Sequence, residues 1–545
     1  MARKLTGRIT VRGTLQAVDA LHIGSGESNL TTDMAVACDG QGRVAAAGTG
    51  IAGALRAWCE RRLDSATVDL LWGFQKADLG HASHLWTADA VIRKPDGSAL
   101  MIDDLLEVRD HVGIDREFGA AAHHIKFDRA ILPPGCLFDL ELILDLPQQH
   151  ASVFQAILHQ MLQALLQQSI RMGAAKTRGL GRIRLLNDNE HELKIVRSDW
   201  SLAAICRKLQ GQETLVPIDV LKQAGVPLPL AEIPRLAIRI DWTPRQPTMI
   251  KSSVDGLLVD TLPLIAGTGV SMAPVIPGSS LIGVLRSRAE MILRTVLNRD
   301  PHWRMQPDSK VRFLDQLDED LPLIHQVFGS RGSRQQPDES YDDDSQAAVA
   351  IGALSIADCF SMHQNSPEAW ADLTYASATG TSEPERYQAI QKGKEAVCRE
   401  GWHVASHNAI DRWTSGVADN ALYQVMEPHG EENWNPFELE LDLARVASTR
   451  EQQEAAFVLL MLTLRDLVRG RVPIGFGGNR GLGEVLIRGI SVTPVEGDPV
   501  GVTRQVSMTG GWDLGIFAED LRFALSQSWN TICDEAATAE ETVHA

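Results

Sequence analysis

Two glycine-rich loops with basic residues could bind phosphate. The stretch from Gly173 to Leu185, GAAKTRGLGRIRL, places Lys176 and Arg178 among three glycines, and GFGGNRGLGEVLI from Gly475 to Ile487 repeats its RGLG element. Glycine lets a backbone approach a ligand closely and expose its N–H groups, while basic side chains add charge. A tight connection with its arginines in solvent would use the same residues, so both interpretations stay open.

Two helix starts offer a second kind of anion site. GTGIAGALR from Gly48 and GSSLIGVLR from Gly278 each predict a helix that begins after a turn of small residues. Unpaired N–H groups and the helix dipole suit a phosphate there. Thr49 and Ser279 could instead cap ordinary helices. Neither stretch is a P-loop, because no Gly-Lys-Ser/Thr follows.

Aspartates and histidines supply the candidates for proton transfer. HIGSGESNLTTD follows a predicted strand and ends at Asp33, and Asp260 lies at the matching place later in the chain. Such a carboxylate could be a base, a metal ligand or a turn residue. His22 could be its acid–base partner or a structural histidine. His123 and His124 have no acidic or cysteine ligands nearby, so they predict no metal site.

The tripeptide Ile-Asp-Arg occurs twice, with Asp115–Arg116 in the first half and Asp411–Arg412 in the second. The arginines could contact phosphate while the aspartates orient them. A structural ion pair is the alternative.

Composition limits the class of protein. The 545 residues carry a net charge of −18, which opposes broad adhesion to nucleic acid but leaves room for a local basic groove. No apolar run reaches the roughly 20 residues of a membrane helix, and the start lacks a signal-peptide core, so we expect a cytoplasmic protein with no membrane contact. Seven scattered cysteines without a CxxC pair argue against a disulfide framework or a cysteine zinc site.

Six landmarks recur in one order and predict a tandem duplication. Residues 9–23 align without gaps on residues 236–250, and the same offset of 227 places Asp33 on Asp260. The other landmarks are the helix starts, LWGF with VFGS, LWTADA with LSIADC, the Ile-Asp-Arg segments and RGLG. Insertions distinguish the second copy; residues 330–346 are expected to be a solvated loop, and residues 366–401 form another insertion. The acidic chain end is expected to be frayed.

Each copy predicts strand, helix, further strands, a second helix and a last strand. Apolar periodicity places the second helices at residues 153–172 and 453–468. The fold class is therefore α+β, with an order that resembles a ferredoxin-like βαββαβ unit. Predicted boundaries are residues 1–190 for the first unit, 191–234 for a linker, 235–499 for the second unit and 500–545 for a C-terminal extension.

Together, LHIGSG…D, IPGSSLIGVLRS, IDRWTSG and NRGLGEV resemble the RAMP superfamily of CRISPR-associated proteins, and within it the backbone subunit of type III effector complexes. The resemblance covers both copies. It implies two tandem RRM-like units with inserted thumb hairpins, which the Ile-Asp-Arg segments resemble, fused as in type III-D-like systems. It also implies a hydrolase in antiviral defence that binds CRISPR RNA and cleaves complementary target RNA as a metal-dependent endoribonuclease.

The resemblance further implies a divalent metal, Mg²⁺, and partners that include CRISPR RNA, target RNA, a polymerase-like large subunit and further backbone subunits. The implied catalytic residues are Asp33 and Asp260. Asp33 is favoured because the second loop, MIKSSVDG, lacks the glycines of the first. The metal ligands are not specified. A non-catalytic scaffold that binds CRISPR RNA and a CRISPR RNA-processing endoribonuclease are the alternative functions.

The residues implied to bind RNA lie in the glycine loops, at the helix starts and in the Ile-Asp-Arg segments. They are Gly24, Gly26, Gly48, Thr49, Gly50, Arg56, Arg116, Lys176, Arg178, Gly179, Gly181, Gly278, Ser279, Ser280, Arg286, Arg412, Arg480, Gly481 and Gly483. The second loop has Gly478 in place of Lys176 and Glu484 in place of Arg182. We therefore expect the first loop to hold RNA more strongly.

Overall fold

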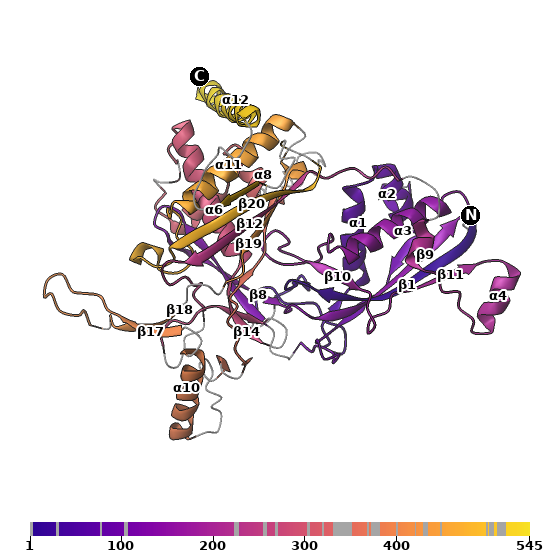
Figure 1. Cartoon of the computed structure of the whole chain (residues 1–545), viewed down its shortest axis with the longest axis horizontal. Coiled ribbons are helices and arrows are strands. Elements are labelled where there is room, and N and C mark those ends of the chain that lie inside the picture. Colours follow the sequence, from indigo (N-terminus) through magenta and orange to yellow (C-terminus); the bar gives the residue numbers. More distant parts are fainter. Residues whose placement is uncertain are drawn as a thin grey trace. The chain divides into compact units, whose positions relative to one another are not determined.

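The computed structural model forms two compact units (Figure 1). Unit 1 comprises Met1–Arg109, Asp128–Lys176 and Leu180–Glu232, and unit 2 comprises Asp110–Phe127, Thr177–Gly179 and Ile233–Ala545. The structure describes residues 4–28, 32–76, 79–102, 107–222, 228–253, 259–267, 271–301, 303, 306–318, 321–330, 351–367, 370–371, 382–398, 402–419, 421–428, 434–446, 449–497, 500, 506–509 and 519–544.

Unit 1 is built on an antiparallel sheet whose central strand is β1 (Leu5–Ala17). β10 (Ile183–Leu186) pairs with one edge of β1 and β9 (Leu137–Pro147) with the other, and β5 (Leu85–Thr87) adds to β9. Alternate residues of β1 are buried against α1 (Gly48–Glu60) and α3 (Ala151–Leu166). This strand order, last–first–third–second, is that of a ferredoxin-like unit.

Unit 2 repeats the arrangement around β12 (Arg235–Pro244). β20 (Val485–Glu496) and β19 (Phe437–Asp442) flank β12, and β15 (Leu354–Ile356) adds to β19. The predicted alternation of Leu236, Ile238, Ile240 and Trp242 is confirmed, since all four are buried in the core with α6 (Gly278–Leu297) and α11 (Arg450–Val468). Both units therefore have the predicted α+β, RRM-like fold.

Backbone hydrogen bonds repeat between the units at the offsets that the sequence comparison uses. In unit 1 the N–H groups of Ala174 and Gly181 donate to the carbonyls of His22 and Ala20; in unit 2 those of Phe476 and Gly483 donate to the carbonyls of Met249 and Pro247. Each glycine-rich loop is thus tied to the end of the first strand of its sheet. The alignment of the two RGLG loops is correct in three dimensions.

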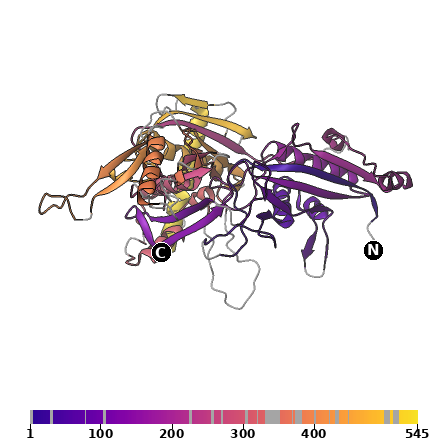
Figure 2. The ribbon, with the colours of Figure 1, turned by 90° about the horizontal axis from the view of Figure 1, so that it is seen from below.

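A β-hairpin is inserted between the second and third sheet strands of each repeat. The first is β7 (Glu107–Asp115) with β8 (Ala120–Ile131), and the second is β17 (Trp402–His407) with β18 (Tyr423–Pro428). Figure 2 shows the second hairpin extending away from the sheet of unit 2. These insertions contain the two Ile-Asp-Arg segments.

The segments outside the repeats have structure of their own. Residues 191–234, expected to be a linker, contain β11 (Lys194–Asp199), which pairs with β1, together with α4 (Leu202–Leu209) and α5 (Ile218–Lys222). Of the expected loop 330–346, residues 331–346 lie outside the described part of the chain. The insertion at residues 366–401 contains α10 (Glu383–Cys398).

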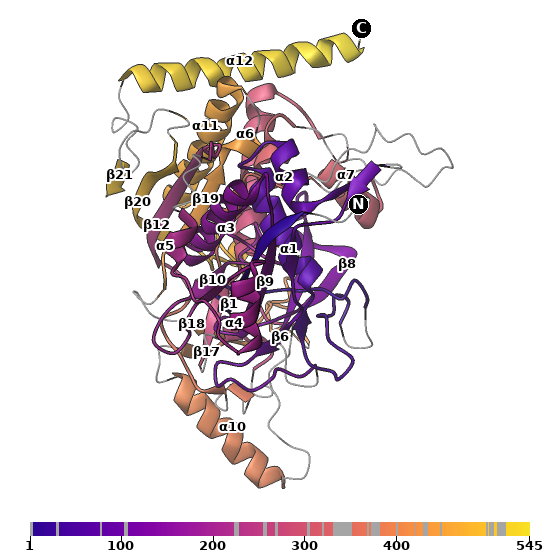
Figure 3. The same cartoon turned by 90° about the vertical axis from the view of Figure 1, so that its right-hand side faces the viewer.

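The prediction of a frayed chain end is wrong, because α12 (Glu519–His544) forms there and lies across α11 and α6 (Figure 3). Leu525 and Ile532 are buried, and the Ser528 hydroxyl donates to Glu454 Oε2 over 2.6 Å. The acidic residues at the end of this helix conceal the apolar residues before them, which pack on α11 and α6.

The remaining elements are β2 (Ala45–Ala46), α2 (Ser65–Trp72), β3 (Phe74–Lys76), β4 (Leu79–His81), β6 (Ala90–Arg93), β13 (Ile265–Gly267), β14 (Met272–Ile276), α7 (Ser309–Asp318), α8 (Ile324–Phe328), β16 (Cys359–Phe360), η2 (Leu443–Arg445), η3 (Gly478–Arg480) and β21 (Val506–Thr509).

Candidate functional site

The loop aspartate of unit 1 is held against the second strand of the inserted hairpin. The Asp33 N–H donates to Asp128 Oδ1 over 2.7 Å, and the Asp128 N–H donates to Asp33 Oδ2 over 3.0 Å. Met34 and Arg129, the next residues, form a parallel bridge. The Asp33 side chain is exposed, and each carboxylate keeps a second oxygen outside this pair of bonds. Two carboxylates therefore stand together at the base of the β7–β8 hairpin.

The loop aspartate of unit 2 occupies the same position. The N–H of Gln424, on β18, donates to Asp260 Oδ2 over 2.7 Å, and the next residues, Thr261 and Val425, again form a parallel bridge. Gln424 stands where unit 1 has Asp128. Unit 1 thus offers two carboxylates at this point and unit 2 offers one.

The described residues contain no group of three or more histidine, cysteine, aspartate or glutamate side chains that could hold a metal ion. Magnesium is commonly bound by one or two carboxylates, with waters and substrate phosphates completing its shell. The donor set of Asp33 and Asp128 fits such a shared site. Asp260 alone fits it less well.

His22 lies beside this site but is buried. Its Nδ1 is 2.7 Å from the carbonyl oxygen of Ala130, and burial lowers the pKa of its imidazole, with the charge of Arg129 acting in the same direction. A neutral, buried ring bonded to the backbone has the structural role that the sequence left open. Gly24 and Gly26 follow on an exposed stretch, and Gly26 has a φ of +82° that favours glycine.

The two helix starts are occupied by internal carboxylates. The Gly48 N–H donates to Asp89 Oδ1 over 2.6 Å, and the Gly278 N–H donates to Asp358 Oδ1 over 2.9 Å. The N-cap residues are Ala47 and Pro277, so the alternative in which Thr49 and Ser279 cap these helices does not hold. A negative charge already sits where the sequence predicted a phosphate.

The turn residues next to these helix starts differ in exposure between the two units. Thr49 and Gly50 are exposed, whereas Ser279 and Ser280 are half-buried. Their predicted contact with RNA stays a prediction.

The arginines on these two helices share two internal bonds, and Arg56 has a third, from its Nη2 to Asp69 Oδ1 over 3.3 Å. Arg56 Nε donates to Glu60 Oε1 over 2.8 Å, and its Nη1 donates to the carbonyl of Gly73 over 3.1 Å. In unit 2, Arg286 donates in the same way to Glu290 over 2.9 Å and to the carbonyl of Gly329 over 3.0 Å. Arg56 thus ties α1 to the turn after α2, and Arg286 ties α6 to the turn after α8.

The basic loop of the first repeat divides into paired and open cations. Arg182 makes a two-point ion pair with Asp19 at 2.7 and 2.9 Å. Arg178 is exposed, and among the described residues it has no hydrogen bond or ion pair. Its partial withdrawal from water lowers the pKa of its guanidinium, and the positive charge of Arg286 adds to this effect. The charge of Arg178 is therefore not neutralised by any described carboxylate, whereas Asp19 neutralises the charge of Arg182.

Two glycines of this loop are needed for its backbone. Gly179 and Gly181 have φ values of +92° and +103°, which side-chain-bearing residues rarely adopt. A Cβ atom on Gly179 would also clash with the Asp358 carboxylate. Lys176 beside them is half-buried.

The glycine loop of unit 2 reaches the neighbourhood of Asp260. Arg480 Nη1 donates to the Tyr423 hydroxyl over 2.6 Å, and its guanidinium lies 5.9 Å from the centroid of the Tyr423 ring and 5.6 Å from that of Phe476. Tyr423 directly precedes Gln424, whose N–H binds Asp260. Gly481 and Gly483, with φ values of +84° and +77°, complete this loop. A cation, an aromatic ring and the loop carboxylate thus converge in one place.

The two Ile-Asp-Arg segments form identical turns. Asp115 Oδ1 accepts from the N–H of Glu117 and the Asp115 carbonyl accepts from Gly119; Asp411 makes the same bonds with Trp413 and Ser415. Their surroundings differ, since Arg116 Nη1 is 2.7 Å from Glu290 Oε2 whereas Arg412 is exposed. Among the described residues Arg412 has no bonding partner.

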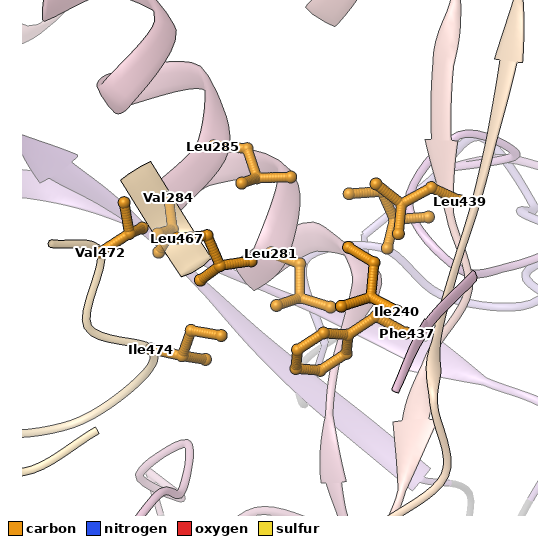
Figure 4. A pocket seen from close by; sticks show the side chains of 10 residues that line it. Ile240, Leu281, Val284, Leu285, Phe437, Leu439, Leu467, Val472 and Ile474 are labelled. Carbon is orange, nitrogen blue, oxygen red and sulfur yellow. The ribbon is translucent and has the colours of Figure 1, made fainter. Parts of the chain in front are cut away.

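A small cavity in the core of unit 2 is lined only by apolar side chains, among them Leu281, Phe437 and Ile474 (Figure 4). It offers no polar group for chemistry. The candidate site therefore lies on the surface, where loop aspartate, hairpin base and glycine loop meet.

Four residues of this site escaped the sequence analysis: Asp89, Asp128, Asp358 and Gln424. Asp89 and Asp358 stand at the same position of the repeated segments LWTADA and LSIADC, so the repeat could have pointed to them. Asp128 and Gln424 differ between the copies and lie outside every repeated landmark. Nothing in the sequence pointed to them.

Comparison with known proteins agrees with this architecture. No helix in the described part of the chain is long and apolar enough to cross a membrane. No curated protein matches the chain. The model of the RAMP superfamily matches residues 14–184 and 262–485, one region for each repeat and together well over half of the sequence. The chain therefore belongs to the RAMP superfamily, whose members are CRISPR-associated RNA-binding proteins.

Proposed function

We propose that this protein is a backbone subunit of a type III CRISPR effector complex, of the type III-D-like tandem form, which binds CRISPR RNA and cleaves complementary target RNA. The observation that carries the proposal is the pairing of Asp33 with Asp128 at the base of the first hairpin. A carboxylate held at a hairpin base can act on a nucleotide that the hairpin displaces from a guide–target duplex. Base pairing selects the target sequence, while protein contacts grip backbone and shape.

In the proposed reaction, the 2′-hydroxyl of the target attacks the adjacent phosphorus in line with the leaving 5′-oxygen. Asp33 accepts the proton of that hydroxyl on its free oxygen, a new O2′–P bond forms and the P–O5′ bond breaks. Water protonates the departing oxygen, so the products are a 2′,3′-cyclic phosphate and a 5′-hydroxyl. A bound Mg²⁺ would neutralise charge on the phosphate, and Asp33 and Asp128 are the residues that would hold it.

Guide binding is assigned to the glycine loops. Arg178 has no protein anion among the described residues, and Arg480 is positioned by the rings of Tyr423 and Phe476. An arginine that is exposed or aromatically braced is suited to phosphate and to stacked bases. The polymerase-like large subunit and further backbone subunits complete the proposed complex.

Unit 2 is the weaker candidate for cleavage. Gln424 stands there in place of Asp128, so Asp260 lacks the carboxylate partner that Asp33 has. We propose that unit 2 contributes mainly RNA binding. This observation favours the scaffold function for that half of the chain.

The test compares Asp33→Asn and Asp260→Asn, singly, in the complex assembled with CRISPR RNA and a 5′-labelled target. We expect Asp33→Asn to slow one cut by about 10²-fold or more, the scale of a lost general base, while CRISPR RNA content stays unchanged. Asp96→Asn is the matched control, since Asp96 is an exposed turn aspartate of the same unit whose carboxylate accepts from Ser98. Unchanged cutting at every position in both variants would refute the catalytic assignment.

A further inference from the structure

The tip of the first hairpin is anchored by an arginine that binds an arginine–glutamate pair on α6. Arg116 Nη1 lies 2.7 Å from Glu290 Oε2, while the other oxygen of Glu290 accepts from Arg286 Nε over 2.9 Å. Only 14 % of the Arg116 side chain and 6 % of the Glu290 side chain are exposed. The Arg286–Glu290 pair on α6 is therefore a socket, and Arg116 fills it.

The neighbouring helix α7 adds contacts to the same tip. Arg312 and Gln316 donate to the Asp115 carboxylate over 2.8 and 3.0 Å, and the Gln316 carbonyl accepts from Arg116 over 2.6 Å. The Arg312 guanidinium also lies over the ring of Phe118 at 4.7 Å. All these groups belong to unit 2.

Unit 1 carries the same socket without an occupant. Arg56 Nε donates to Glu60 Oε1, and the Arg56 Nη1 bond to Gly73 matches the Arg286 bond to Gly329. Arg56 differs from Arg286 in one further pair, with Asp69 at 3.3 Å. Half of the Glu60 side chain, 50 %, is exposed, and no other described arginine or lysine contacts it. Arg116 covers Glu290 in unit 2, and Glu60 is more exposed because no second described cation covers it.

The second hairpin carries the same tip without a socket. Its turn repeats the side-chain and backbone bonds that Asp115 accepts from the residues two and four positions later, which places Arg412 at the position of Arg116. Around Arg412, Trp413 is 94 % exposed and Ile410 is 54 % exposed. Large apolar side chains left in water beside an unpaired cation are typical of a surface that another protein covers.

We propose that Arg56 and Glu60 form an open socket for the hairpin-tip arginine of a RAMP unit on a separate chain. Arg412, in turn, enters the matching socket of a RAMP unit on a second separate chain. The contact between Arg116 and Glu290 is the template for both, and the charges are complementary in each case. The presence of neighbouring RAMP chains rests on the proposed function. The socket geometry stands independently of it.

The two open halves face different partners. Unit 1 offers the accepting socket, Arg56 with Glu60, and unit 2 offers the inserting arginine, Arg412. Contacts of this kind are head-to-tail and do not close on themselves. No helix lies between α1, which ends at Glu60, and α2, which begins at Ser65, so unit 1 has no counterpart of α7. The arginine contact must therefore carry more of the binding at Glu60 than it does at Glu290.

The experiment uses the effector complex purified through a tag on this protein and weighed by native mass spectrometry. Glu60→Arg should lower the occupancy of one RAMP neighbour at least about tenfold, since like charges now meet in the socket. Arg412→Glu should release a different RAMP neighbour. Glu60→Gln, which removes the charge with little change of shape, should weaken the first contact less than the reversal does.

Glu192→Arg is the control, because Glu192 is a well-exposed acid of unit 1 whose own partner is the exposed Lys194. It should retain both neighbours. Thermal unfolding of each variant separates lost binding from lost folding. Retention of both neighbours by folded Glu60→Arg and Arg412→Glu proteins would overturn the proposal, and so would a wild-type complex without any RAMP neighbour. RAMP neighbours present without CRISPR RNA would refute the proposed function and leave the socket standing.

Discussion

Asp33 and Asp128 hold each other through two reciprocal hydrogen bonds, each backbone N–H donating to the other residue's carboxylate. The bonds join residues 95 positions apart, so they tie the loop after the first strand to the base of the inserted hairpin. The position of the loop carboxylate is therefore fixed relative to the base of the hairpin. This coupling makes Asp128 as testable as Asp33.

Asp128→Ala should slow target cleavage about fivefold, because it removes the acceptor of the Asp33 N–H, a bond worth about 1 kcal/mol. Asp128→Asn keeps an amide oxygen at that place and should retain more activity. Rates are measured in single-turnover assays at several Mg²⁺ concentrations. If the asparagine variant instead falls as far as the alanine variant and needs more Mg²⁺, the charge of Asp128 matters and its role is that of a metal ligand.

Asp89→Ala and Asp358→Ala should each lower the free energy of unfolding by about 1 kcal/mol, the usual cost of losing a bond at a helix start. Denaturant unfolding of the full chain measures the change. Thr49→Ala and Ser279→Ala are matched controls, since neither side chain caps its helix, and they should change stability by under about 0.5 kcal/mol. Equal effects in all four variants would contradict the assignment of the caps to the aspartates.

Arg178→Ala should weaken binding of single-stranded CRISPR RNA and reduce the slope of log affinity against log salt by about 0.7, the value for one lost phosphate contact. Arg480→Ala should do the same and also remove a cation–π contact. Arg182→Ala is the control, because its charge is already neutralised by Asp19. Fluorescence anisotropy over a salt series gives the slopes. An Arg182→Ala slope that falls as much as that of Arg178→Ala would show that the ion pair opens to RNA.

The docked hairpin tip should be released by acid. Burial raises the pKa of Asp115, but the hydrogen bonds from Arg312 and Gln316 outweigh it and hold that pKa below its ordinary value. The resulting stabilisation is present above the pKa of an unfolded aspartate and is lost as pH falls through the lower, folded value. Hydrogen exchange of the amides of residues 110–127 between pH 7 and pH 3 follows this loss.

Asp115→Asn should remove that pH dependence and destabilise the tip at neutral pH by about 3 kcal/mol, because it leaves the buried Arg312 without its counter-charge. Tip amides that stay protected in this variant at pH 7 would show that Arg116 and Glu290 suffice.

The sequence by itself determined the fold of each half and the correspondence between the halves. Period-two burial in β12 and the helical spacing after Gly278 follow from side-chain chemistry within a few residues, so local patterns report them directly. The repeat added the equivalence of Asp33 with Asp260 and of the two RGLG loops. Local patterning failed at the chain end, where acidic residues concealed a helix that is stabilised by packing on α11.

Only the tertiary structure decided which charges are free. Arg116 and Arg412 both follow Ile-Asp and lie in the same turn, yet Arg116 is paired with Glu290 with only 14 % of its side chain exposed, and Arg412 is exposed. Likewise Arg178 and Arg182 stand four residues apart, and a distant aspartate neutralises only the second. An ion pair or a carboxylate pair depends on which remote segments the fold brings within about 3 Å, and a linear sequence does not specify that distance.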